Sequence, residues 1–178
     1  MSEFKSNLKI SCINITNSFF LDCFLFDAKS LKQLELSIKK HGIQTPILLY
    51  KDAHKILHLA DGFQRIKYAS KDITYHICAD LEKVLDIILQ NNKFKITNSL
   101  ASKIYFIKKL QELKIPKKTI QAYFLPALSL DNHEVMLPKY LKISKLSLQV
   151  LQFCAEKQLS LKQCLHLLNL PQNLLLTI

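Results

Sequence analysis

The sequence predicts an α+β protein, with a mixed α/β domain over residues 1–92 followed by an all-helical domain over residues 93–178. Four short runs typical of strands occur up to residue 79, and helical patterns lie between them. After Asn98 the periodic apolar segments all have helical spacing. Residues 90–95 are polar and carry no periodic apolar face, which is typical of a domain boundary.

The first domain opens with a strand and a helix. Residues 8–15 alternate loosely between apolar and polar side chains, as a strand does. Residues 27–41 carry apolar side chains three and four positions apart, which predicts a helix, and Gly42 is expected to close it.

A hairpin and a third strand follow. Two apolar runs, 46–50 and 55–59, are separated by a polar turn and predict a β-hairpin. A helical pattern over 63–69 then precedes a strand at 74–79 and a helix from 81 to about 89.

The second domain is predicted to contain helices only. Apolar spacing predicts an amphipathic helix over 104–113, and Pro116 is expected at the first position of the next helix. Residues 131–134 and Lys139 are candidates for base contacts on a recognition helix, but we expect Pro138 to interrupt that helix.

The Leu-rich tail, residues 146–178, is interpreted as helical core. Leu148 and Leu151 belong to its apolar pattern, and Cys154 and Cys164 fit a buried position among them.

The cysteines and the hydropathy bear on location. An odd, scattered set without a C-x-x-C pair favours free thiols in a reducing compartment and disfavours zinc. No apolar run reaches the ~18 residues needed to cross a bilayer, so we expect a cytoplasmic protein with no membrane contact. The five cysteines are Cys12, Cys23, Cys78, Cys154 and Cys164.

The net charge of +11 is concentrated in the second half of the chain. Residues 91–178 hold 13 Lys against four acidic residues, whereas residues 1–90 are nearly balanced. Such a field favours a polyanion, because each Lys placed on a phosphate releases a condensed counterion. Nucleic acid is the expected partner, and a solvated helix face in a Lys-rich chain is the alternative.

The clearest local motif is Asp61-Gly62-Phe63-Gln64-Arg65. The chain has 24 Lys but only one Arg, and this Arg lies three residues from one of only two Gly. A guanidinium binds phosphate or carboxylate through a planar fork, and Gly lets backbone approach a ligand at a strand-to-helix junction. The motif therefore predicts a phosphate cradle. The alternative is that Gly62 closes a turn while Arg65 pairs with Asp61 or with a surface carboxylate.

Asp61 and two nearby histidines are of residue types that can bind a metal ion. Asp61 is expected to cap the helix that follows, in preference to holding a phosphate-bound metal. His54 and His58 have the spacing of helical zinc ligands, but the region is predicted to be turn and strand. We therefore interpret His58 as a partly buried residue of an edge strand and expect no metal site.

Residues 26–47 and 60–69 form two sequence blocks. In order and spacing they resemble the N-terminal domain of the ParB partition proteins and of the wider ParB/sulfiredoxin-like superfamily. Residues 88–91 and 98–102 resemble a third block, and segments between residues 114 and 163 resemble the helix-turn-helix region.

This resemblance implies a nucleotide-binding domain, using CTP or another nucleotide with Mg, joined to a helical DNA-binding domain in partition or regulation. DNA is then the partner, and a homodimer is compatible with this interpretation. The residues expected to bind the nucleotide or its phosphates are Gly42, Thr45, Pro46, Asp61, Gly62, Gln64, Arg65 and Asn91. The residues expected to contact DNA are Lys108, Lys109, Lys114, Lys117, Lys118 and Lys139.

The chain also departs from the ParB pattern. Gln90-Asn91 stands where ParB has Glu-Asn, and losing that carboxylate removes a metal ligand, so we expect little or no nucleotide hydrolysis. Phe63-Gln64 excludes the thiol chemistry of sulfiredoxin at this site. Two alternatives stay open, a free-serine-kinase type of phosphotransferase that uses the Asp61-Gly62-x-x-Arg65 core, and a scaffold that binds no nucleotide.

Overall fold

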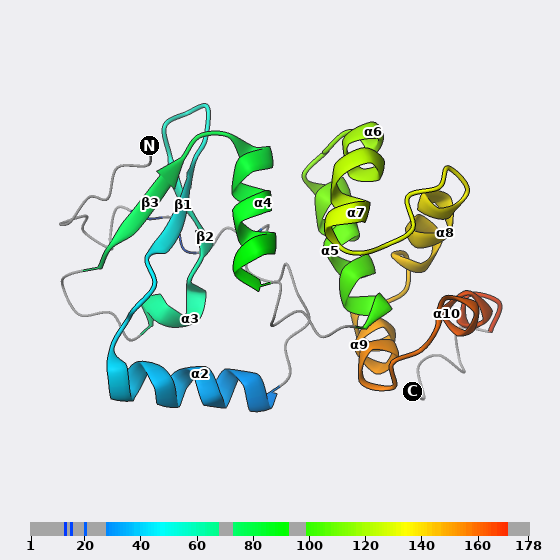
Figure 1. Ribbon diagram of the computed structural model, residues 1–178, viewed down its shortest axis with the longest axis horizontal. Helices are drawn as coiled ribbons and strands as arrows, with labels where there is room; N and C mark the ends of the chain where they lie inside the picture. Colours follow the sequence, from blue (N-terminus) through cyan, green and yellow to red (C-terminus); the bar gives the residue numbers. More distant parts are fainter. Residues whose placement is uncertain are drawn as a thin grey trace. The chain divides into compact units, whose positions relative to one another are not determined.

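The computed structural model describes Ile13, Ile15, Phe20 and residues 28–67, 73–92 and 99–170. Apart from Ile13 and Ile15, the strand expected over residues 8–15 lies outside the described residues. Contacts between Cα atoms divide the chain into two compact units. Among the described residues, 28–92 fall in the first unit and 99–170 in the second (Figure 1).

Helix α2, Ala28–His41, confirms the helix expected before Gly42. Gly42 has a φ of +69°, and its N–H donates to the carbonyl of Ile38 at 2.8 Å, which ends the helix in the way that a left-handed residue commonly does. The last turn carries Lys39, Lys40 and His41, whose positive charges suit the negative end of the helix dipole.

A three-stranded mixed sheet, with strand order β2-β1-β3, forms the centre of the first unit. Strands β1 and β2 are antiparallel, which confirms the predicted hairpin, and β1 and β3 are parallel. Because β1 lies between two strands, its Ile47, Leu48 and Leu49 are at most 2% exposed. The strands are β1 Ile47–Lys51, β2 Leu57–Asp61 and β3 Tyr75–Cys78.

The hairpin turn is held by one carboxylate. Asp52 Oδ1 accepts from the Ile56 N–H at 2.8 Å, and Asp52 Oδ2 lies 2.8 Å from His58 Nε2. The hydrogen bond from His58 lowers the pKa of Asp52. The His58 side chain is 12% exposed on the edge strand β2, which confirms the partly buried edge position inferred from the sequence.

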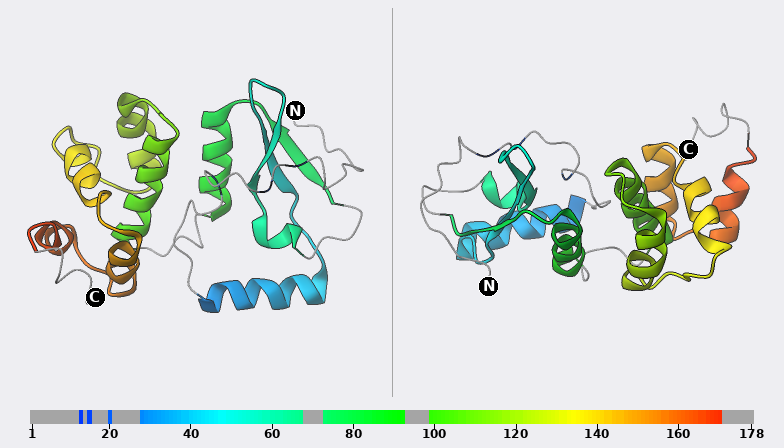
Figure 2. Two further views of the ribbon diagram at one scale, coloured as in Figure 1. Left: turned by 180° about the vertical axis from the view of Figure 1, so that it is seen from behind. Right: turned by 90° about the horizontal axis from the view of Figure 1, so that it is seen from above.

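Two helices complete the first unit. Helix α3, Phe63–Ile66, follows β2 directly, and helix α4, Leu81–Asn92, lies beside the sheet and contacts all three strands (Figures 1 and 2). The α4 side chains at positions 84, 85, 88 and 89 are at most 2% exposed, so one face of the helix is core. Helix α4 was expected to end at about residue 89, but it continues through residues 90–92 and therefore includes Asn91.

The described residues of the second unit form helices joined by turns and loops, with no strand among them, as predicted. Helix α5 is the central element, because Ile104, Phe106, Ile107 and Leu110 are fully buried and the helix contacts α8, α9 and η2. The helices are α5 Leu100–Glu112, α6 Lys117–Thr119, η2 Ile120–Phe124, α7 Leu125–Ala127, α8 Met136–Ile143, α9 Leu148–Glu156 and α10 Leu161–Leu167.

Elements α6, η2 and α7 form one helical run over 117–127, widened to a π-helix in its middle. Pro126 explains the widening. Its ring would collide with the carbonyl of Ala122 in a regular α-helix, and it has no N–H to donate there. A π-turn shifts that carbonyl, so the run continues past Pro126 instead of breaking.

Three sequence expectations for the second unit were wrong. Pro138 does not interrupt a recognition helix, because α8 begins at Met136 and places Pro138 in the first turn, where its missing N–H has no intrahelical acceptor. Pro116 is the N-cap residue of α6 and not its first helical residue. Leu148 is 45% exposed, because it directly follows the N-cap Ser147 on the outer side of α9.

Candidate functional site

Gly62 makes the turn between β2 and α3. Its φ is +104°, a conformation that side chains other than glycine rarely adopt, and its carbonyl accepts from the Ile66 N–H at 2.9 Å. A Cβ atom added here would lie 2.7 Å from Cγ2 of Ile47 and 3.3 Å from Nε of Arg65. The position therefore requires glycine for both backbone and space.

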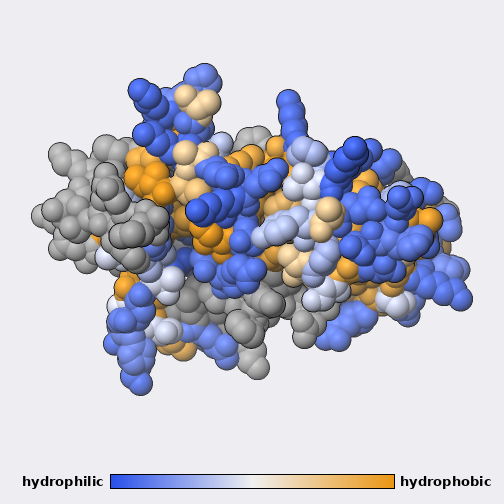
Figure 3. Space-filling model, turned by 45° about the horizontal axis from the view of Figure 1, so that its top comes forward, coloured by the Kyte–Doolittle hydropathy of each residue, from blue (hydrophilic) through white to orange (hydrophobic). Residues whose placement is uncertain are grey.

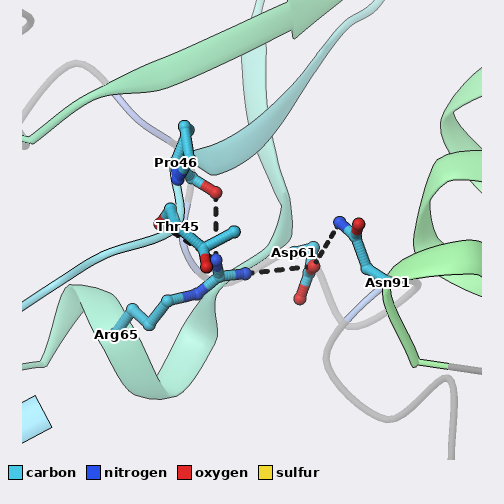
Figure 4. A network of polar contacts seen from close by, with 5 residues as sticks. All are labelled: Thr45, Pro46, Asp61, Arg65 and Asn91. Atoms are coloured by element: carbon cyan, nitrogen blue, oxygen red, sulfur yellow. Dashed lines mark hydrogen bonds and ion pairs between the residues drawn. The ribbon is translucent and has the colours of Figure 1, made fainter. Parts of the chain in front are cut away.

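Arg65 reaches back from α3 across the start of β1. Its Nη1 donates to the carbonyls of Thr45 and Pro46, each at 3.0 Å, and its Nη2 forms an ion pair with Asp61 Oδ2 at 3.0 Å (Figure 4). The guanidinium side chain is only 13% exposed. A planar fork with several fixed donors can satisfy three acceptors at once, which a single ammonium group does less well.

Asp61 binds both Arg65 and Asn91. The same Oδ2 atom that pairs with Arg65 also accepts from Asn91 Nδ2 at 3.1 Å (Figure 4). The expected capping role of Asp61 is wrong, because the N-cap residue of α3 is Gly62 and no side chain caps that helix. The carboxylate instead joins the end of β2 to the end of α4.

The network brings together five of the eight residues that were predicted to bind a nucleotide, namely Thr45, Pro46, Asp61, Arg65 and Asn91. It also shows the alternative raised from the sequence, in which Arg65 pairs with Asp61. The guanidinium therefore already has an anionic partner. A phosphate would have to replace that carboxylate or share Arg65 with it, and two anions at one guanidinium repel each other.

The other predicted nucleotide residues have local contacts. Gly42 is exposed at the end of α2, and Gln64 accepts a hydrogen bond from Lys67 Nζ at 3.0 Å. Gly62 lies at the network, but its role there is backbone geometry. Within the described residues, no three His, Cys, Asp or Glu side chains gather in a way that could hold a metal ion.

The predicted DNA-contacting lysines divide into two groups. Lys114, Lys117 and Lys118 are exposed, whereas Lys108, Lys109 and Lys139 are half-buried. Lys109 Nζ pairs with Glu112 at 3.0 Å and lies 5.5 Å from the centre of the Tyr105 ring, so its charge is partly compensated within α5. Hydrophilic side chains stand out from the molecular surface on the face shown in Figure 3.

The three exposed lysines surround the turn between α5 and α6. Lys114 has a φ of +59° and ends the turn after α5, and Lys117 and Lys118 are the first two residues of α6. The first turn of α6 contains no acidic residue, and its N-cap residue, Pro116, provides no side-chain hydrogen bond. Three cations therefore lie at the positive end of a helical run, which concentrates positive potential there.

One contact in this region was missed from the sequence. Gln121 Nε2 donates to the carbonyl of Asn132 at 3.2 Å, which fastens the run over 117–127 to the segment that precedes α8. Helical periodicity reports which residues share a face, and it carries no signal for a side chain that binds a distant backbone carbonyl.

Comparisons with known proteins give a distant structural likeness. No protein-family model and no curated protein matches the chain. The similar solved structures include the C-terminally truncated chromosome-partitioning protein ParB from Caulobacter crescentus complexed with CTP-gamma-S, with 14% sequence identity and a TM-score of 0.39 over 94% of this chain and 93% of that chain. The same truncated protein complexed to the centromeric parS site has 13% identity and a TM-score of 0.35 over 93% of this chain and 97% of that chain. Among the described residues, no helix has the length and apolar character of a membrane span.

We predict that Gly62→Ala lowers the free energy of unfolding by about 2–4 kcal/mol, through a strained φ and overlap with Ile47. Gly42→Ala is the matched control, because its φ is also positive but nothing lies within 4 Å of an added Cβ. We expect it to cost about 1–2 kcal/mol. Urea denaturation of both variants measures the difference, and equal losses would contradict the steric argument.

We predict that Arg65→Lys lowers the free energy of unfolding by about 1–3 kcal/mol, because one ammonium cannot keep all three contacts of the guanidinium. The reverse exchange Lys67→Arg, at an exposed position next to α3, is the control and should change stability by less than about 0.5 kcal/mol. If both exchanges leave the denaturation midpoint unchanged, the internal contacts of Arg65 contribute nothing to stability.

Proposed function

We propose that this chain is a non-catalytic nucleic-acid-binding protein whose second unit contacts DNA phosphates. The observation that carries the proposal is the group of exposed lysines, Lys114, Lys117 and Lys118, around the start of α6. The sequence blocks that resemble ParB favour a role in DNA partition or in regulation.

The charge of the second half of the chain supports a polyanionic partner. It holds 13 Lys and only four acidic residues. Among the described residues of this half, Lys109 of α5 forms an ion pair with Glu112. Lysines that have no nearby acid gain most from a phosphate, because the gain comes from releasing counterions and needs no particular base sequence. We therefore expect binding that is strong at low salt and weak at high salt.

The residues before α8 support sequence readout less well. Residues 131–134 are exposed but precede the helix, and they include the acids Asp131 and Glu134, which repel phosphates. The Asp131 carboxylate also accepts from the His133 N–H at 2.9 Å, within the segment itself. Phosphate contacts that position DNA without reading its bases are consequently the main mode that we propose.

A second candidate function is nucleotide binding in the first unit. The observation in its favour is that Thr45, Pro46, Asp61, Arg65 and Asn91, which are far apart in the sequence, meet at one place. In this candidate function the nucleotide phosphates would take the place of Asp61 as the anionic partner of Arg65.

A phosphotransferase is less well supported by the same contacts. Asp61 is the candidate general base in the motif, but its carboxylate is already bound to Arg65 and Asn91. A general base needs a carboxylate within hydrogen-bond reach of the substrate proton, and the two contacts of Asp61 hold its Oδ2 atom on Arg65 and Asn91 instead. We therefore propose binding without catalysis.

For DNA binding, we predict that a variant with both Lys117→Ala and Lys118→Ala binds a short duplex about tenfold more weakly at low salt and reduces the slope of log affinity against log salt by about 2. Fluorescence anisotropy at several salt concentrations measures both quantities. The matched control replaces Lys157 and Lys162, two exposed lysines elsewhere in the unit, and removes the same charge. If the two double variants weaken binding equally, Lys117 and Lys118 are not a specific DNA contact and only the overall charge of the unit attracts DNA. A wild-type affinity that does not change with salt would exclude the proposal.

For nucleotide binding, we predict that CTP with Mg²⁺ raises the thermal midpoint of the wild-type chain in a concentration-dependent way. The same titration on Arg65→Lys, measured against that variant's own midpoint, should show no rise. ATP, GTP and UTP serve as comparisons of base preference. If no nucleotide changes the wild-type midpoint, the second candidate function is rejected and the DNA-binding proposal is unaffected.

A further inference from the structure

Two cysteines of the second unit lie at the junction of α9 and α10. Cys154 is on α9 and Cys164 is on α10, and both are fully buried. Leu159, in the turn between these helices, binds both of them. Its N–H donates to the carbonyl of Cys154 at 3.0 Å, and its carbonyl accepts from the Cys164 Sγ at 3.8 Å.

The two thiols also contact each other. A hydrogen bond between them raises the pKa of Cys154, and burial raises it further. The same hydrogen bond lowers the pKa of Cys164, against the opposing effect of burial. A thiolate is the form that attacks a disulfide, and the directions of these two shifts favour Cys164 as the attacking sulfur.

Cys164 is the most deeply buried residue of its helix. It is the only residue of α10 that is fully buried, while Leu161, Leu165 and Leu167 are half-buried. The helix itself is well started, because Ser160 and Gln163 form a capping box. Helix α10 is only seven residues long and packs on α8, and local opening of so short a helix would give a reagent access to both thiols.

We propose that Cys154 and Cys164 form a reversible disulfide site that fastens α10 to α9. The inference rests on the positions of these two side chains and is independent of the proposed DNA and nucleotide functions. The partner in the reaction is a small-molecule disulfide, such as oxidised glutathione.

The reaction is a pair of thiol–disulfide exchanges. The Cys164 thiolate attacks one sulfur of the reagent, forms a mixed disulfide and releases one reagent thiolate. The Cys154 thiolate then attacks the Cys164 sulfur, forms the internal bond and releases the second reagent thiolate. The two cysteines lose two electrons, the reagent disulfide gains them, and the two protons end on the two reagent thiols.

The test uses the full chain with Cys12, Cys23 and Cys78 replaced by Ser, so that only the proposed pair remains, beside the wild-type chain. After oxidised glutathione under native conditions, we expect a mass lower by two hydrogens and one cross-linked peptide that contains both cysteines. The bond closes a short loop, so we expect a rise of the thermal midpoint on the order of 10 °C and slower hydrogen exchange in α10. Dithiothreitol should reverse all three changes.

Two further samples separate the outcomes. In the same background, Cys154→Ser removes the second thiol, and we expect it to stop at a mixed disulfide between glutathione and Cys164. A parallel oxidation in urea shows that the reagent and the two thiols can react when the chain is unfolded. The proposal is overturned if the native chain keeps both thiols reduced, or carries glutathione on each cysteine, while the link forms in urea.

Discussion

The ion pair between Arg65 and Asp61 is the contact on which the geometry of the first unit depends. Through it one guanidinium holds the chain entering β1, the end of β2 and its own helix α3, and Asn91 adds the end of α4. These four segments are joined through short-range hydrogen bonds to a single part-buried charge pair. Buried or part-buried pairs are costly to break because the remaining charge loses its partner, so the network fixes these segments more firmly than their apolar contacts alone would.

Features that one local signal determines could be predicted from the sequence. The hairpin, the closing role of Gly42, the edge position of His58 and the burial of the two C-terminal cysteines all follow from period, turn chemistry and residue type. The Arg65 motif lies where four segments of the first unit meet, and phosphate binding there stays a prediction. Its two interpretations, phosphate binding and an internal ion pair, use the same donor fork, and only coordinates show which acceptor is within reach.

The features that could not be predicted depend on the residue at which a helix begins. Asp61 was expected to cap α3, but the turn at Gly62 moves the cap one residue on and frees the carboxylate for Arg65. Pro138 was expected to break a helix, yet a start at Met136 makes the same proline harmless. When the first residue of a helix shifts by one or two positions, a residue near that end changes its structural role. Local sequence patterns define such boundaries less sharply than they define the helices themselves.

The mixed sheet also sets an order of assembly for the first unit. Lys51 pairs with Leu57 within the hairpin, only six positions along the chain, whereas Ile47 pairs with Tyr75, 28 positions along the chain. Closing the longer loop costs about 1.4 kcal/mol more chain entropy than closing the shorter one. The hairpin can form while the rest of the chain is still a coil, and the parallel strand joins only after β2 and α3 have brought it back. In kinetic terms, the late step for this unit is the docking of β3, and a nascent chain that stops before residue 75 would leave one side of β1 without its neighbour.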